Sequence, residues 1–132
     1  MITGGKIISV EAKRDSDGQV TGMSINIGLD SLDVKGEDIE IAYTYTVSYA
    51  EKVGRLVIKG ILYAREERGK AGEIAKSWKA SKKLPLDFAE AVLNTINYAC
   101  GTNGTLVVRP VNLSPPMIPP KIEIAKGGSA AG

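Results

Sequence analysis

The chain has 132 residues, of which 43% are apolar and 24% are charged, and its net charge is +2. This size and balance fit one globular domain with its own core. The chain lacks histidine, the commonest general base and metal ligand, and its single cysteine, Cys100, excludes an internal disulfide. No apolar run could span a membrane and the first residues are not typical of a signal peptide. We therefore expect a cytoplasmic protein that is not an enzyme and uses no cofactor or metal.

Charge is distributed unevenly along the chain. Residues 1–51 carry four basic and nine acidic side chains, whereas residues 52–83 carry ten basic and three acidic ones. A basic region can bind an anionic partner such as nucleic acid. Its candidate phosphate contacts are Arg55, Lys59, Arg65, Lys79 and Lys83. No nucleic-acid-binding motif accompanies them, and Tyr63 and Trp78 are the only nearby aromatic residues, so nucleic-acid binding is the less favoured alternative.

Residues 1–30 show the alternation of apolar and polar side chains that is typical of strands. Ile8, Val10 and Ala12 share one face of the first segment, and the run from Met23 to Leu29 repeats the pattern. The cluster Asp15-Ser16-Asp17-Gly18 between them favours a turn. The sequence therefore predicts two strands joined by a hairpin.

The third predicted strand has the strongest alternation in the chain. Three tyrosines lie on its apolar face, Tyr43, Tyr45 and Tyr49, and threonine or other small or polar residues lie on the opposite face. Such a strand fits an antiparallel sheet with one covered side. A fourth strand is predicted over residues 55–65, with apolar residues on both of its faces.

Two helices are predicted after Gly69. Ala71, Ile74, Ala75 and Trp78 follow helical spacing, and Trp78 is the expected core anchor of this first helix. The step Leu84-Pro85 separates it from a second helix, because proline favours the first turn of a helix. The second helix has a stripe that is formed by Phe88, Val92, Ile96 and Ala99 and widened by Ala89, Leu93 and Cys100. Gly101 is expected to cap it and Gly104 to close the following turn.

The segment Leu106 to Pro120, LVVRPVNLSPPMIPP, holds five of the six prolines and is otherwise largely aliphatic. Prolines exclude a central strand or a regular helix, so an apolar segment of this kind must pack on the domain or meet a partner. Strands followed by helices favour an α+β fold, a four-stranded antiparallel sheet with two helices packed on one face. We expect one domain over residues 1–124 and a flexible tail over residues 125–132.

Several of these residues resemble the SecB family of protein-export chaperones. The helix opening Leu84-Pro85-Leu86-Asp87-Phe88-Ala89, the glycines at 101 and 104, and the segment LVVRPVNL match the order and motifs of that family over roughly residues 6–117. The resemblance implies a SecB-like fold, a homo-oligomer (dimer or tetramer) and binding of unfolded polypeptide. The chain departs from the family in its slightly basic charge and in lacking the metal-coordinating end that contacts the SecA motor, so coupling to secretion is not implied.

The leading functional hypothesis is therefore a SecB-like holdase that binds extended or unfolded polypeptide through an exposed apolar groove. Candidate contacts are Tyr43, Tyr45, Tyr49, Met117 and Ile118, because aromatic residues and methionine adapt to varied apolar partners. The opposing interpretation is that the tyrosine row is the face on which the helices pack. A structural or adaptor subunit of a stable oligomer is the second alternative. We expect the first half of residues 106–120 to pack through Val107, Pro110 and Val111, and residues 115–120 to meet a neighbour or client.

Overall fold

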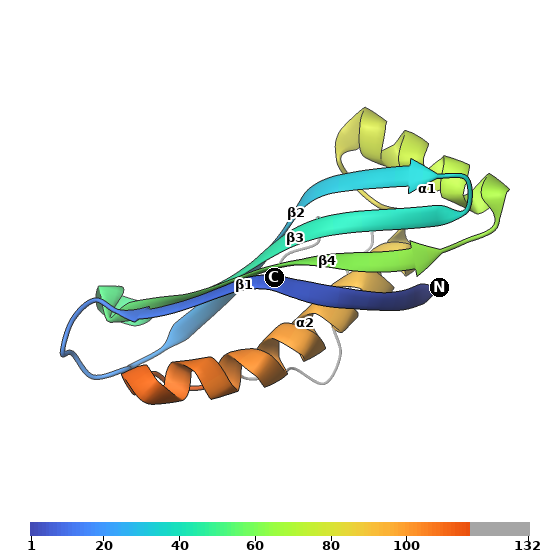
Figure 1. The fold of residues 1–132 in the computed structure, drawn as a ribbon. Helices are drawn as coiled ribbons and strands as arrows, with labels where there is room; N and C mark the ends of the chain where they lie inside the picture. Colours follow the sequence, from blue (N-terminus) through green and yellow to red (C-terminus); the bar gives the residue numbers. More distant parts are fainter. Residues whose placement is uncertain (117–132) are drawn as a thin grey trace.

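The computed structural model describes residues 1–116, which form one antiparallel sheet and two α-helices (Figure 1). The strands are β1 (Ile2–Arg14), β2 (Met23–Lys35), β3 (Asp38–Tyr49) and β4 (Gly54–Arg65). The helices are α1 (Arg68–Ser81) and α2 (Leu86–Val108), and the short 3-10 turns are η1 (Ala50–Lys52) and η2 (Arg109–Val111). The α+β class and the four-stranded antiparallel sheet with helices on one face are confirmed. No helix in the described part of the chain is long and apolar enough to cross a membrane.

The strand order is β1-β4-β3-β2, so the predicted hairpin between the first two strands is wrong. β1 and β2 lie at opposite edges, and residues 15–22 cross the end of the sheet between them (Figure 1). The backbone N–H of Asp15 bonds to the Val53 carbonyl at 2.8 Å, and that of Ala50 bonds to the Gly22 carbonyl at 2.8 Å. Alternation within a strand defines its two faces but not its neighbour, which is why the pattern could not reveal the crossover.

The residues of β1 that face the core also differ from those predicted. A register shift between Ile7 and Ser9 makes a β-bulge opposite β4, and Ile7 packs against the core in place of Ile8. The side chain of Ile8 is left 58% exposed. Because a bulge inserts one residue, it reverses the alternation at that point.

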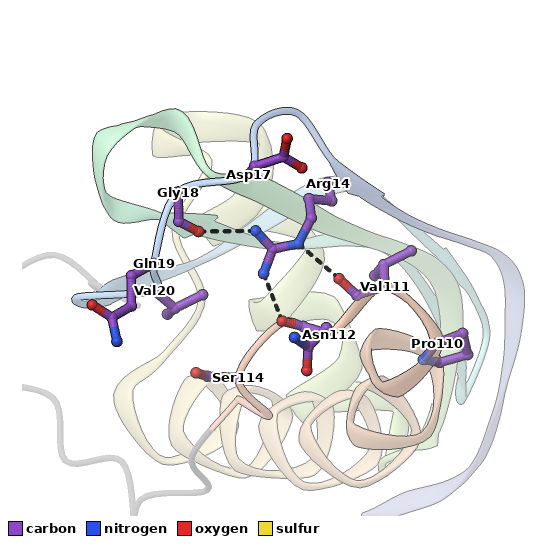
Figure 2. Close-up of a pocket in the computed structure, with 9 residues that line it drawn as sticks. All are labelled: Arg14, Asp17, Gly18, Gln19, Val20, Pro110, Val111, Asn112 and Ser114. Atoms are coloured by element: carbon purple, nitrogen blue, oxygen red, sulfur yellow. Dashed lines mark hydrogen bonds between the residues drawn. The ribbon is translucent and has the colours of Figure 1, made fainter.

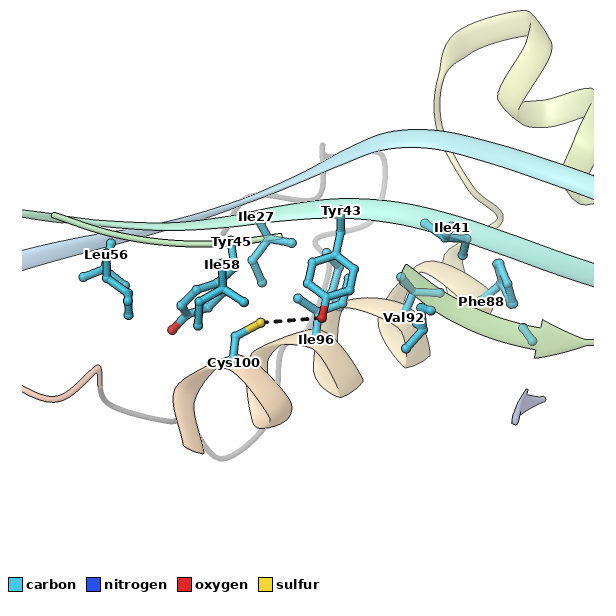
Figure 3. Close-up of a cluster of buried hydrophobic side chains, with 14 of the residues drawn as sticks. Ile27, Ile41, Tyr43, Tyr45, Leu56, Ile58, Phe88, Val92, Ile96 and Cys100 are labelled. Carbon is cyan, nitrogen blue, oxygen red and sulfur yellow. Dashed lines mark hydrogen bonds between the residues drawn. The ribbon is translucent and has the colours of Figure 1, made fainter. Parts of the chain in front are cut away.

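The core fills the space between one face of the sheet and α2 (Figure 3). The sheet contributes alternate residues such as Ile41, Tyr45 and Ile58, and α2 contributes Val92 and Ile96, all of which are buried. Ala71 and Ile74 of α1 join the same cluster beside them. Trp78 is buried at 8% exposure, as expected of an anchor, although it lies outside the main cluster.

Helix α2 continues past the glycines that were predicted to end it, so that prediction is wrong. Gly101 and Gly104 are both buried inside the helix, which ends at Val108. A Cβ atom at Gly104 would lie 2.7 Å from Cδ2 of Leu56 and 3.3 Å from Cγ of Pro116. Gly104 therefore lies where helix, sheet and returning chain approach so closely that a residue without a side chain is favoured.

The proline segment packs through different residues from those expected. Asn112 adopts a left-handed conformation (φ 56°), and the N–H of Leu113 bonds to the Val108 carbonyl at 3.1 Å. Leu113 and Pro116 are buried, whereas Pro110 is exposed. The anchoring role assigned to Pro110 is thus wrong, while Val107 and Val111 are partly buried against the core. Met117, Ile118, the boundary at residue 124 and the tail lie outside the described residues and stay predictions.

Candidate functional site

The tyrosine row lies beneath α2 rather than on an open groove. Tyr43, Tyr45 and Tyr49 are 4%, 0% and 3% exposed, respectively. Figure 3 shows Tyr43 and Tyr45 pointing from β3 toward α2. An extended client cannot reach these rings in this conformation, so their proposed role as an exposed contact surface disagrees with the structure. The opposing interpretation, that this face receives the helix, describes what is observed, because the most apolar face of a central strand gains most from being covered.

The groups that could react chemically in this core are neutral. The Cys100 thiol donates to the Tyr43 hydroxyl at an S···O distance of 3.8 Å, and the Tyr49 hydroxyl donates to the Ser114 carbonyl. Burial raises the pKa of Cys100 to about 11 and the pKa of Tyr45 to about 12. A buried thiol with a raised pKa is a packing residue, as the sequence predicted for Cys100, and not a nucleophile.

An open cleft of about 760 Å³ lies where the 15–22 crossover meets the end of α2 (Figure 2). One wall carries Gln19 and Val20, and the other carries Pro110, Val111 and Asn112. The second wall is the Pro-Val-Asn segment that carried the family resemblance. The sequence motif and the cleft therefore coincide.

Arg14 holds the two walls together. Its Nε atom donates to the Val111 carbonyl at 2.9 Å and its Nη2 atom donates to the Asn112 carbonyl at 2.7 Å. Its Nη1 atom donates to the carbonyls of Ser16 and Gly18, each at 2.9 Å. Figure 2 shows the bonds to Gly18, Val111 and Asn112. Four of the five guanidinium N–H groups are thus engaged by backbone, so Arg14 builds the cleft rather than binding an anionic ligand.

Apart from the carboxylate of Asp17, the free surface of the cleft is apolar or carries amide groups, which suits an extended chain. Val20, Pro110 and Val111 offer apolar contact. The side chains of Gln19 and Asn112 can donate and accept hydrogen bonds, which matches the needs of a peptide backbone. Sequence reasoning missed Arg14 and Gln19, because Arg14 appears only as the last residue of a strand and its partners Val111 and Asn112, in η2 and at its end, are 97 and 98 residues away.

The outer side of α2 is a second exposed surface. Residues 91–108 contain no charged side chain, and Tyr98 and Leu106 are 67% and 64% exposed. An uncharged helix face with exposed large apolar residues is typical of a contact surface. Among residues 1–116, no group of three or more His, Cys, Asp or Glu residues could hold a metal ion.

No family model matches the sequence, and no curated protein matches it. A solved structure does match: the SecB-like chaperone Rv1957 of Mycobacterium tuberculosis, in complex with a ChAD peptide from the HigA1 antitoxin. The match covers 95% of this chain and 90% of that chain, with a TM-score of 0.53 and 9% sequence identity. At this identity the likeness establishes the fold, and it confirms that the chain has a SecB-like fold.

Proposed function

We propose that this protein is a holdase that binds extended or unfolded polypeptide and limits its aggregation. The observation that carries the proposal is the fold shared over 95% of the chain with a chaperone solved with a peptide bound. Two features of this chain add support. Its core thiol and phenols are buried and neutral, and residues 91–108 of α2 carry no charge and expose Tyr98 and Leu106. The proposal places this activity in the cytoplasm and requires no enzymatic step.

The cleft between the crossover and the end of α2 is the proposed client site, in place of the tyrosine row. Its volume of about 760 Å³ and open form accommodate an extended segment, and its walls offer both apolar surface and amide groups. The clamp at Arg14 favours this role because a preformed cleft loses less entropy on binding than a flexible loop. Met117 and Ile118 directly follow this region in sequence, and we retain them as proposed client contacts.

The test is suppression of aggregation of a chemically denatured model protein, followed by light scattering after dilution. We expect the wild type to suppress scattering near equimolar ratio. The double variant Gln19→Glu/Pro110→Asp should lose most of this effect, because two carboxylates disfavour apolar clients at exposed cleft positions. Ser9→Asp/Ser24→Glu, which adds the same charge at two separate positions on the exposed outer face of the sheet, is the matched control.

Two outcomes would contradict the proposal. A wild type that leaves scattering unchanged at equimolar ratio removes the holdase function. Equal activity of the cleft variant and its control removes the cleft as the client site while the function itself stands.

We also propose that the protein self-associates, as a dimer or tetramer, through α2. The support is the uncharged outer side of that helix, where Tyr98 and Leu106 lie 67% and 64% exposed. Tyr98→Glu/Leu106→Glu should shift the mass in size-exclusion chromatography with light scattering from oligomer to monomer. A monomeric wild type would contradict self-association. An oligomer that binds no client would favour the alternative of a structural or adaptor subunit.

A further inference from the structure

A second groove, of about 440 Å³, lies between β2 and α1. Its floor is formed by Leu32 and Val34 of the strand and by Ala75 and Trp78 of the helix. Leu32 and Val34 belong to the last part of β2, whereas the cleft held by Arg14 lies at the end of the sheet where β2 begins (Figure 1). The groove is therefore separate from the proposed client cleft.

One side of this groove is a strand edge. β2 pairs with β3 and with no other described strand, so alternate backbone groups along its outer edge have no partner in a β-ladder. An edge of this kind can accept an extended polypeptide as an added strand, with side-chain pockets beside it providing selectivity. Leu32 and Val34 face the same side as their cross-strand partners in the core, so they present aliphatic surface next to that edge.

The other side of the groove is strongly basic. Residues 68–83 contain six basic side chains and one acidic one. Within residues 1–116, Lys70 pairs with Glu66 at 3.7 Å, but Lys76 and Lys79 make no ion pair with another described residue. These two lysines line the groove, so an occupant with carboxylates would be attracted to its helical side.

The groove is better suited to polypeptide than to nucleic acid. Binding of a single strand needs an aromatic face on which bases stack. Trp78 is only 8% exposed, and the Lys82 ammonium lies over its ring at 5.4 Å from the centroid. The aliphatic floor, the open strand edge and the two lysines without ion pairs within residues 1–116 together match the features of an extended peptide.

We propose that the groove between β2 and α1 binds an extended polypeptide segment in which apolar residues are interspersed with acidic ones. Apolar side chains contact Leu32, Val34 and Ala75, and carboxylates pair with Lys76 and Lys79. This inference rests on the proposed holdase function and adds to it a preference for acidic, apolar segments at a second site.

Trp78 makes the site measurable, because it is the only tryptophan in the chain. The experiment titrates the full chain with a capped ten-residue peptide of alternating leucine and glutamate and follows Trp78 emission. A peptide with lysine in place of glutamate is the charge control. We expect the acidic peptide to shift the emission and to bind more weakly as salt rises, and the basic peptide to leave it unchanged.

The matched variants are Lys76→Glu/Lys79→Glu in the groove and Lys6→Glu/Lys59→Glu on the uncovered face of the sheet. All four lysines are exposed, and each variant changes the net charge equally. We expect the groove variant to weaken binding of the acidic peptide at least roughly tenfold, and the sheet-face variant to change it less than roughly twofold.

The outcomes distinguish this site from the function on which it rests. Equal weakening in both variants, or binding without a change in Trp78 emission, overturns the groove even where aggregation is still suppressed. A Trp78 response to a mixed oligonucleotide but not to the acidic peptide overturns the choice of polypeptide. Failure of the wild type to suppress aggregation, with the peptide response intact, removes the holdase function and leaves the groove.

Discussion

The two faces of the sheet differ most clearly along β3. On the inner face, Ile41, Tyr45 and Val47 are fully buried against the helical layer. On the outer face, Thr44 and Thr46 are only half-buried, and Thr44 donates a hydrogen bond to Asp30 at 2.6 Å. No described element covers that outer face (Figure 1). This chain covers its strongly apolar sheet face with its own helices, so the surface left for binding lies at the ends and edges of the sheet and on the outside of the helices.

Removing a ring from the inner face should have the largest effect. Tyr45→Ala deletes a fully buried aromatic side chain, and we expect a loss of about 3–5 kcal/mol in the free energy of unfolding. Thr46→Ala, its neighbour on the outer face, should cost less than about 1 kcal/mol. Denaturant unfolding followed by circular dichroism measures both. Similar losses at the two positions would mean that the outer face is also covered in solution.

Alkaline pH should weaken the inner face selectively. Burial raises the pKa of Cys100 from 9.0 to about 11 and that of Tyr45 from 10.0 to about 12. Both groups are neutral when protonated, so the unfolded chain releases their protons first and stability falls as pH rises. The contribution of Cys100 is complete below about pH 9 and lost progressively up to about pH 11, and it is on the order of 3 kcal/mol.

The measurement is the free energy of unfolding from urea titrations between pH 8 and pH 11, compared between wild type and Cys100→Ala. The variant lacks the thiol and should show a shallower decline over this range. An identical decline in both proteins would mean that the thiol has no raised pKa in the folded state.

The contrast between faces also explains how far sequence reasoning reached. Alternation predicted four strands and identified the inner face of β3, and helical spacing predicted both helices, because burial on one side leaves a periodic record. Strand order left no such record, since β1 would show the same pattern beside β4 or β2. The bulge at Ile8 and the long reach of Arg14 to Val111 and Asn112 depend on contacts between distant segments. Family resemblance pointed to the Pro-Val-Asn segment, but only the fold brought it opposite residues 15–22.

Crowding the inner surface should cost less than emptying it. Gly104→Val places a branched side chain where Cβ alone would lie 2.7 Å from Leu56, and we expect a loss of about 1–3 kcal/mol. Asn103→Val introduces the same side chain one residue earlier, at an exposed helix position, and should change stability by less than about 1 kcal/mol. Thermal and urea unfolding of the two variants measure the difference. Equal stability of the pair would show that α2 shifts readily away from β4.

The smallest predicted effect is that of removing a single hydroxyl group from the inner face of the sheet. The Tyr45 hydroxyl is buried without a hydrogen-bond partner among the described residues, whereas the Tyr49 hydroxyl donates to the Ser114 carbonyl. A buried unsatisfied hydroxyl costs free energy, so Tyr45→Phe should be neutral or stabilise the protein by up to about 1 kcal/mol. Tyr49→Phe removes a hydrogen bond and should destabilise it by about 1 kcal/mol. The two variants lose the same atom from the same strand face, so their urea midpoints should move in opposite directions or differ clearly in size. If Tyr45→Phe destabilises the protein as much as Tyr49→Phe does, the Tyr45 hydroxyl has a partner in solution, and the inner face is less dry than its burial indicates.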